Sequence, residues 1–215
     1  MPKNFHKNKY NSGVTLIELL VVICIFMILT SITIFNYGKF NSSLSIQNLA
    51  DDIALSVRRA QGFAIGVRGS SGNFTPGYGV HFTANPNSGV FAGSYKSFVL
   101  FTDMNDDHQY NNSTNICGSP KSGDECLELL NITTADSINS IFLNEDNALQ
   151  PADTVDLLFK RPSPEPTFCY RIGGTGSCSP ISISKIKIRL STNASVPVYK
   201  TITISNNGQI SVSDL

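Results

Sequence analysis

The stretch Gly13-Val14-Thr15-Leu16-Ile17-Glu18, followed by an apolar run from Leu19 to Phe35, decides how this chain folds. The run contains no charged residue, and its only polar side chains are the hydroxyls of Thr30, Ser31 and Thr33. Counted from Val14, it reaches 22 residues with a single acid among them, which is enough to cross a bilayer as one helix. The sequence therefore predicts a membrane-spanning N-terminal helix.

The flank before this stretch is basic, with Lys3, Lys7 and Lys9 and no acid before Glu18. Because cytoplasmic flanks of membrane helices are rich in lysine and arginine, we expect the N-terminus to stay in the cytoplasm. A cleaved secretory signal peptide is the alternative, but its apolar segment is shorter and a small-x-small cleavage site follows it. The run here ends in Ile34-Phe35-Asn36-Tyr37-Gly38, which offers no such site. The pattern favours a retained helix.

Glu18 is the only acid in the apolar stretch. A carboxylate at mid-bilayer costs about 2.5–3.5 kcal/mol, and less near the interface, so such a residue usually marks function. One interpretation is that Glu18 snorkels to the lipid headgroups. In the other, cleavage after Gly13 makes Val14 the new N-terminus, and its amine neutralises Glu18 between packed helices, where paired charges are tolerated.

Basic leader, glycine, apolar residue, Thr-Leu-Ile-Glu and apolar helix together resemble the signal of type IV pilins and type II secretion pseudopilins, over roughly 25 of the 215 residues. The resemblance implies that prepilin peptidase cuts between Gly13 and Val14 and that Val14 is then N-methylated. It implies that Glu18 aids docking, on an inner-membrane assembly platform, into a filament of other pilins or pseudopilins joined through their N-terminal helices. It also implies a bacterial inner-membrane protein whose C-terminal domain is periplasmic before it enters a pilus or pseudopilus.

Helical periodicity continues beyond the apolar run. Apolar residues recur at steps of three or four and form one stripe, made by Leu49, Ile53, Val57, Ala60 and Ala64. Glycines 66, 69 and 72 then end the pattern. Since no proline interrupts residues 14–66, we expect one helix of about 80 Å. After a leader of residues 1–13, its half over 14–36 faces lipid or a filament core, and its half over 37–66 faces a soluble domain.

After Gly72 the chain consists of short runs rich in β-branched and aromatic residues, separated by proline, glycine, asparagine and serine. The expected strands are Tyr78–Phe82, Val90–Phe91, Ser97–Thr102, Cys126–Ile132, Ile138–Leu143, Val155–Lys160, Phe168–Ile172, Ile181–Leu190, Val198–Ser205 and Gln209–Val212. Asn206-Asn207-Gly208 predicts a hairpin turn. A long helix followed only by strands predicts the α+β class, with the helix packed on an antiparallel β-sheet of residues 73–215. This arrangement matches the pilin fold.

Two further stretches favour a minor component within that resemblance. The segment 49–61, with its Asp51-Asp52 and Arg58-Arg59 pairs, and the segment 100–107 resemble minor prepilins of the GspH/FimT type, which are associated with filament-tip or priming complexes. A major pilin is the alternative. Without the three leader lysines, 13 of the 16 basic residues remain against 16 acidic ones. Such a mildly acidic chain disfavours bulk attraction to nucleic acid, although it permits a local basic patch.

The cysteines predict an oxidised exported domain. Cys24 lies in the apolar helix and is expected to pack as a small residue. Two pairs, Cys117/Cys126 and Cys169/Cys178, each close a short loop, and an even count in an oxidising compartment predicts two disulfides. Zinc is the alternative, but neither pair has two-residue spacing and no histidine is nearby in the sequence.

Two other patterns have a structural and a functional interpretation. Asp103, Asn105 and Asp107 resemble the start of a calcium loop, but His108 replaces its glycine and Thr114 its glutamate, so an acidic turn is favoured.

Lys185, Lys187 and Arg189 alternate with aliphatic residues, as on a solvated strand face over a buried one. The functional alternative is a DNA-contacting ladder, since some FimT-like minor pilins take part in DNA uptake. The alternation reverses upstream of Ser184, so either a bulge resets it or the regular strand starts only there.

The sequence does not predict an enzyme, a cofactor or a resident metal. His81 and His108 are the only histidines beyond the leader, and no serine, cysteine or paired-carboxylate constellation accompanies them. The competing hypotheses are a structural filament subunit and a filament-tip module that binds DNA, a surface or a secreted substrate. A third is an unprocessed single-pass protein. The sequence does not distinguish a type IV pilus from type II secretion or competence machinery.

Overall fold

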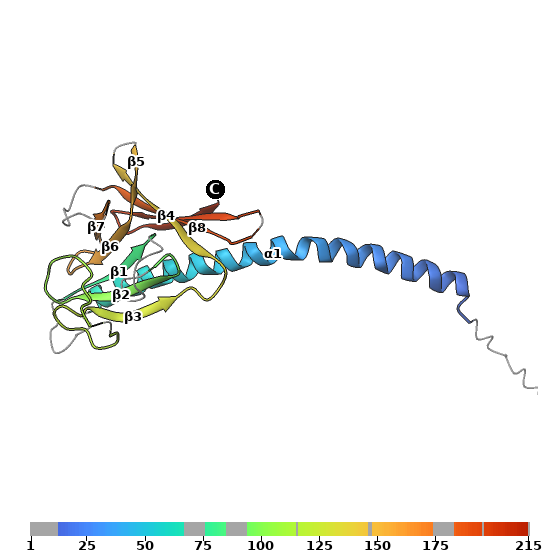
Figure 1. The fold of residues 1–215 in the computed structure, drawn as a ribbon, viewed down its shortest axis with the longest axis horizontal. Coiled ribbons are helices and arrows are strands. Elements are labelled where there is room, and N and C mark those ends of the chain that lie inside the picture. Colours follow the sequence, from blue (N-terminus) through green and yellow to red (C-terminus); the bar gives the residue numbers. More distant parts are fainter. Residues whose placement is uncertain are drawn as a thin grey trace, which may run out of the picture. The chain divides into compact units, whose positions relative to one another are not determined.

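A computed structural model describes residues 13–66, 76–84, 94–114, 116–145, 148–173, 183–194 and 196–214. Within these residues, helix α1 (Leu16–Ile65) is followed by ten strands (Figure 1). The strands are β1 (Gly77–Thr83), β2 (Ser97–Asp103), β3 (Cys126–Asn131), β4 (Ser137–Glu145), β5 (Ala148–Ala152), β6 (Thr154–Phe159), β7 (Pro166–Arg171), β8 (Lys185–Ser191), β9 (Tyr199–Ser205) and β10 (Ile210–Asp214). The prediction of an α+β chain with one long N-terminal helix is confirmed.

The chain divides into two compact units, Met1–Asn41 and Ser42–Leu215, and α1 runs through the boundary. In the first unit, the described residues are the approach to α1 and the apolar part of the helix. The second unit contains the rest of α1 and all the described strands. All the tertiary packing described below belongs to the second unit.

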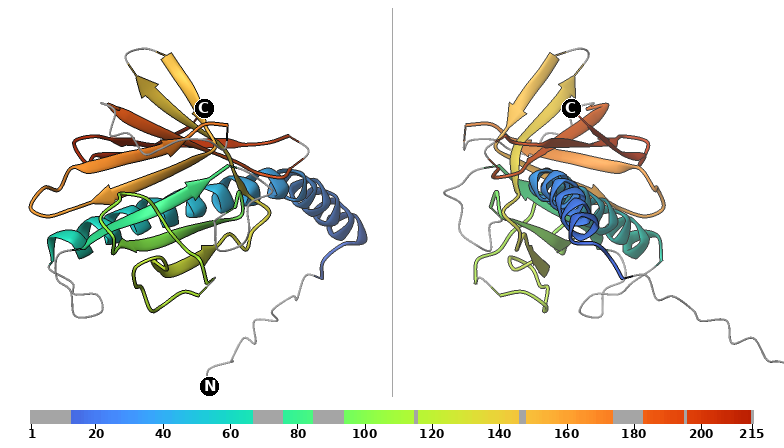
Figure 2. Two further views of the ribbon diagram at one scale, coloured as in Figure 1. Left: turned by 60° about the vertical axis from the view of Figure 1, so that its left-hand side comes forward. Right: turned by 90° about the vertical axis from the view of Figure 1, so that its right-hand side faces the viewer.

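The strands form two five-stranded antiparallel sheets. The first has the order β3-β2-β1-β6-β7 and the second the order β10-β9-β8-β4-β5, so the chain crosses between them after β3, β5 and β7 (Figure 2). The sequence predicted one sheet. Side chains point to alternate faces of a strand whichever sheet the strand joins, so this pattern does not show how many sheets form. The division into two sheets depends on long-range pairings such as β1 with β6 and β4 with β8.

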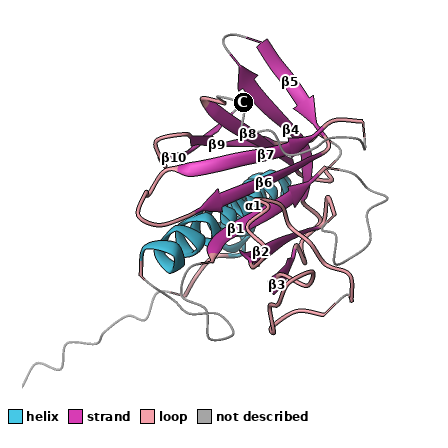
Figure 3. Cartoon of the chain, turned by 90° about the vertical axis from the view of Figure 1, so that its left-hand side faces the viewer, coloured by secondary structure: helices cyan, strands magenta, loops and turns pink. Residues whose placement is uncertain are grey.

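The second part of α1 lies against the strands (Figure 3), and one hydrophobic core joins it to both sheets. The predicted helical stripe is buried, with Ile53, Val57 and Ala60 fully inaccessible to solvent. Strands of both sheets contribute to the same cluster, for example Val80 from β1 and Ile188 from β8. Burying this stripe on two sheets stabilises the second part of α1, as tertiary packing rather than intrinsic propensity stabilises most helices.

Most predicted strands are present, and the differences have local causes. Strand β5 was not predicted because Pro151 interrupts its short run, and proline is tolerated only where it costs no ladder hydrogen bond, as on this edge strand. Strand β8 starts at Lys185, after the non-strand residues Ile183 and Ser184, so the regular alternation begins only there. Ile181 and Ser182 of the predicted strand lie outside the described residues. Gly208, with φ of 81°, completes the predicted hairpin turn between β9 and β10. The predicted strand Val90–Phe91 lies outside the described residues.

Candidate functional site

The predicted cleavage site lies in the non-helical segment that precedes α1. Gly13 and Val14 are exposed, and a Cβ atom added at Gly13 would meet no neighbouring heavy atom within 4 Å. The local structure therefore leaves the peptide bond between Gly13 and Val14 accessible to a peptidase. The cut and the methylation of Val14 stay predictions.

Thr15 and Glu18 form the start of α1. The backbone N–H of Glu18 donates a hydrogen bond to the Thr15 hydroxyl at 3.3 Å. A threonine followed three residues later by glutamate is the capping-box pattern, and a negative charge in the first turn is favoured by the helix dipole. Glu18 thus has a local role that the sequence interpretation missed, although the Thr-x-x-Glu spacing carries the signal. Its role in docking stays a prediction.

Over residues 16–34, the large apolar side chains are exposed on every face of the helix. They are Leu16, Ile17, Leu19, Leu20, Val21, Val22, Ile23, Ile25, Phe26, Met27, Ile28, Leu29, Ile32 and Ile34. By length and composition, α1 is able to cross a membrane. Its polar side chains fit this environment, because the hydroxyls of Thr30 and Thr33 donate to the carbonyls of Phe26 and Thr30 at 2.9 and 2.8 Å.

The segment 104–125, which joins β2 to β3, covers the face of the first sheet that is turned away from α1. Alternate residues of β2 divide between two apolar clusters: Leu100 belongs to the core with α1, whereas Val99 and Phe101 pack with Tyr110 of the segment. As a result, both faces of β2 are buried along its whole length. We call residues 104–125 the cover segment.

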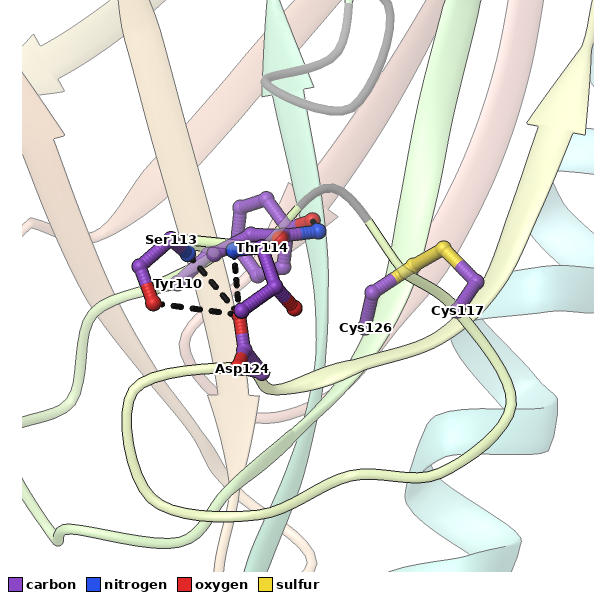
Figure 4. The surroundings of a disulfide bond; sticks show 7 residues. Tyr110, Ser113, Thr114, Cys117, Asp124 and Cys126 are labelled. Carbon is purple, nitrogen blue, oxygen red and sulfur yellow. Dashed lines mark hydrogen bonds between the residues drawn. A yellow bond between two sulfur atoms is a disulfide. The ribbon is translucent and has the colours of Figure 1, made fainter.

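A disulfide and several carboxylates hold the cover segment. Cys117 and Cys126 are bonded, with their Cα atoms 4.7 Å apart, as the sequence predicted for this pair (Figure 4). Asp124 accepts the backbone N–H groups of Ser113 and Thr114 at 2.9 and 2.7 Å (Figure 4). Cys169 is buried in β7, and its predicted partner Cys178 lies outside the described residues.

Glu125 accepts backbone N–H groups from both ends of the first half of the cover segment. Its donors are Met104 at 2.9 Å, Asn105 at 3.4 Å and Asn111 at 3.0 Å. Burial raises the pKa of Glu125 to about 7, and the hydrogen bonds oppose this shift only in part. Burial also raises the pKa of Asp103. Burial alone would raise the pKa of Asp124, but the hydrogen bonds from Thr114 and Ser113 together lower it below its ordinary value.

The calcium-like pattern folds into a turn built on these acids. Asp103 accepts the N–H groups of Asp107 and His108, each at 3.2 Å, and His108 has a positive φ of 63° where the calcium pattern has glycine. The structure adds Glu125 to this group, which the sequence spacing did not show. Carboxylate oxygens of Asp103, Asp107 and Glu125 lie within 4.8 Å of one another. Asn105 instead donates to Asp107 at 3.0 Å. Backbone donors satisfy much of this cluster, as expected for an acidic turn.

The three predicted cations share one face of the second sheet. Lys185, Lys187 and Arg189 are partly exposed and alternate with the buried residues Ile186, Ile188 and Leu190. This arrangement agrees with a solvated face over the core. Contact with DNA stays a prediction.

One buried pair lies on the covered face of the first sheet. His81 of β1 and Asp156 of β6 are register partners, and His81 Nδ1 lies 2.5 Å from Asp156 Oδ1. The ring of Tyr110 packs at 5.0 Å from the His81 ring. Because both residues are buried and the His81 ring packs against Tyr110, we interpret the pair as part of the packing of this face.

Comparison with family models finds one match, to the prokaryotic N-terminal methylation motif, over residues 8–34. Neither the search of curated proteins nor that of solved structures gave a match. The match covers Lys9 of the basic flank, the exposed Gly13–Val14 bond, the Thr15–Glu18 cap and the apolar part of α1. This family of signals belongs to structural pilins and not to a class of enzymes, and with the apolar helix it indicates membrane anchoring. The chain therefore carries the signal of a type IV pilin-like or pseudopilin precursor.

Proposed function

We propose that this chain is a minor pilin or pseudopilin, a structural subunit of a type IV pilus or a type II secretion pseudopilus. Prepilin peptidase cuts between Gly13 and Val14, Val14 is N-methylated, and the N-terminus of the precursor is cytoplasmic. On an inner-membrane platform, the subunit joins other pilins or pseudopilins through its N-terminal helix, with Glu18 guiding the docking. The β domain is periplasmic.

The observation that carries this proposal is the exposure of apolar side chains on every face of α1 within the methylation motif. Exposed apolar surface costs about 25 cal/mol per Å² in water, so a helix of this kind needs another apolar environment. Lipid supplies that environment before assembly, and the helices of neighbouring subunits supply it afterwards.

The second part of α1 adds support. Leu44 and Leu55 remain 46% and 58% exposed although the opposite stripe of the helix is buried. They are separated by eleven residues, or about three helical turns, and therefore share one face. Exposed leucines on the face turned away from the β domain are consistent with packing against neighbouring subunits beyond the membrane-spanning part.

Mass spectrometry of the N-terminal peptide from native membranes tests the proposal. We expect a peptide that begins with N-methylated Val14. The variant Gly13→Leu should leave the uncut precursor, whereas Gly38→Ala, which alters another unobstructed glycine, should be processed normally. A native protein that keeps its Met1 leader, or that is cut downstream of Phe35, would contradict the proposal.

A filament-tip binding module for DNA, a surface or a secreted substrate is the second candidate function. It is favoured by Lys185, Lys187 and Arg189, for which the structure records no ion pair within the part of the chain that it describes. Abundance in sheared filaments separates a major structural subunit, which should dominate them, from a tip module, which should be rare there. DNA binding through these cations would weaken steeply with rising salt.

A further inference from the structure

The outer face of the second sheet combines cations with hydroxyl groups. The strand register places Lys187 of β8 opposite Thr203 of β9, and Arg189 opposite Thr201. Side chains of such cross-strand partners have their Cβ atoms about 5 Å apart. On the next strand, Ser213 is the partner of Thr201. Rows of cationic and hydroxyl side chains therefore lie next to each other on one face.

These side chains line a cavity of about 250 Å³. Its walls are formed by Phe142, Lys187, Arg189, Thr201, Thr203, Ser213 and Asp214. Asp214 is the only acid among them, and it is already paired with Lys200, whose Nζ lies 2.6 Å from its Oδ1. Lys185 is on the same strand face but does not line the cavity.

Arg189 is held in place at the cavity wall without a charged partner in the described part of the chain. Its guanidinium carbon lies 5.0 Å from the centre of the Phe142 ring. Its Nε atom is buried and has no hydrogen-bond partner among the described residues. A buried donor without a partner is costly, and a fixed guanidinium with its charge uncompensated attracts an oxyanion.

We propose that this cavity binds a phosphate group, held by Lys187 and Arg189 and by the hydroxyls of Thr201 and Thr203. Two cations match the charge of a phosphate dianion better than that of a single carboxylate. The neutral hydroxyls donate further hydrogen bonds and add no negative charge to the site. The cavity is smaller than the roughly 300–1,000 Å³ of pockets for drug-sized ligands, so it takes the phosphate group and not a large molecule. The site is separate from the assembly helix and goes beyond the proposed structural role.

The test is calorimetric titration of the full-length protein in a neutral detergent with inorganic phosphate, at constant ionic strength. We expect saturable binding at one site, and a loss of about tenfold or more in affinity for Arg189→Gln, as for removal of a charge-assisted hydrogen bond. Lys185→Gln is the matched control, because it removes the same charge from the same strand face outside the cavity. It should leave the affinity within about twofold.

Arg189→Lys provides a second variant that keeps the charge and removes the planar fork, and it should bind with intermediate affinity. Melting curves of all variants verify that each is folded. Equal weakening by Lys185→Gln and Arg189→Gln would overturn the proposal, because diffuse charge would then explain the binding. No saturable binding of phosphate would overturn it as well.

Competition identifies the source of the group. A short single-stranded oligonucleotide that displaces phosphate in an Arg189-dependent manner would support the site and assign its ligand to a phosphodiester. Displacement by a small phosphate monoester such as glycerol phosphate, and not by the oligonucleotide, would support the site with a small ester as its ligand. Oligonucleotide binding that leaves bound phosphate in place would support the site for a small phosphate and exclude a phosphodiester as its ligand.

Discussion

Two stretches of α1 differ in the exposure of their apolar side chains. In residues 16–34 apolar side chains occupy every face and are exposed, as for Ile25 at 53%. In residues 46–64 most of them form one buried stripe, with Ile53 at its centre 0% exposed, and Leu55 on the opposite face is the exposed exception. The second stretch packs into the core with the strands of the β domain. The length and composition of the first stretch fit a membrane-spanning helix.

The apolar side chains of α1 therefore fall into two groups with different roles. Those of the second stretch stabilise the fold of the subunit, since their partners are strands of the same chain. Those of the first stretch act in the membrane and, on the proposed function, between subunits. Changes in the two stretches should therefore alter different measurements, and the predictions below use that separation.

The largest effect is expected from Glu18→Gln. It removes the charge in the first stretch and nearly keeps the shape of the side chain. We expect at least about a tenfold drop in the subunit recovered in sheared filaments, because the desolvated Val14 amine is left without a charged partner, which costs several kcal/mol. The melting temperature of the β domain should not change.

Asp51→Asn is the control for that variant, because Asp51 is an exposed acid of the second stretch and accepts hydrogen bonds from Gln47. It should leave filament incorporation intact. Equal incorporation of Glu18→Gln and the wild type would remove the docking role of Glu18 and leave it with the helix cap alone.

Ile53→Ala and Ile25→Ala delete the same atoms from the two stretches. The first leaves a cavity among the helix and both sheets, and should lower the free energy of unfolding of the β domain by about 2–5 kcal/mol. The second should change it by less than about 0.5 kcal/mol. Chemical denaturation in detergent, followed by circular dichroism, measures both. Similar losses would mean that the first stretch also packs within the subunit.

Removing the disulfide of the cover segment should have an effect of intermediate size on stability. The double variant Cys117→Ser/Cys126→Ser should lower the free energy of unfolding by about 2–3 kcal/mol, since it opens a short closed loop over the first sheet. Cys24→Ser is the control, because Cys24 is an exposed free cysteine of the first stretch and should have no effect on the domain. A double variant as stable as the wild type would show that carboxylate hydrogen bonds alone hold the cover segment.

A smaller effect should appear as a pH dependence of the cover segment. Because the pKa of Glu125 is raised to about 7 from 4.5, the folded state binds a proton more tightly than the unfolded state. The stabilisation is thus fully present below about pH 4.5 and is lost as the pH rises towards 7, at up to about 1.4 kcal/mol per pH unit. Glu125→Gln should flatten this slope.

The slope is the diagnostic quantity, because glutamine has one acceptor oxygen fewer and changes the absolute stability as well. An unchanged slope in Glu125→Gln would assign the pH dependence to other acids. For an acidic turn without a bound ion, calcium should not shift the melting temperature at pH 7.5. A calcium-induced rise that Glu125→Gln abolishes would instead assign Asp103, Asp107 and Glu125 to a cation site.

The sequence by itself determined the long helix, its two stretches, the processing signal and most strands. These features depend on local rules: the length of an apolar run, the 3.6-residue period, the alternation of strands and the turn residues around Gly208. They also place Gly13, Val14 and Glu18 without reference to any other part of the chain. The pairing of Cys117 with Cys126 follows from short-range loop closure in the same way.

Only the tertiary structure decided the division into two sheets, the burial of both faces of β2 and the meeting of Glu125 with Asp103 and Asp107. It likewise brought the hydroxyls of β9 beside the cations of β8. Each of these depends on which strands pair and on where a connecting segment lies. The physical reason is that alternation fixes which residues share a face, whereas the neighbour on that face is chosen by packing between residues far apart in the chain.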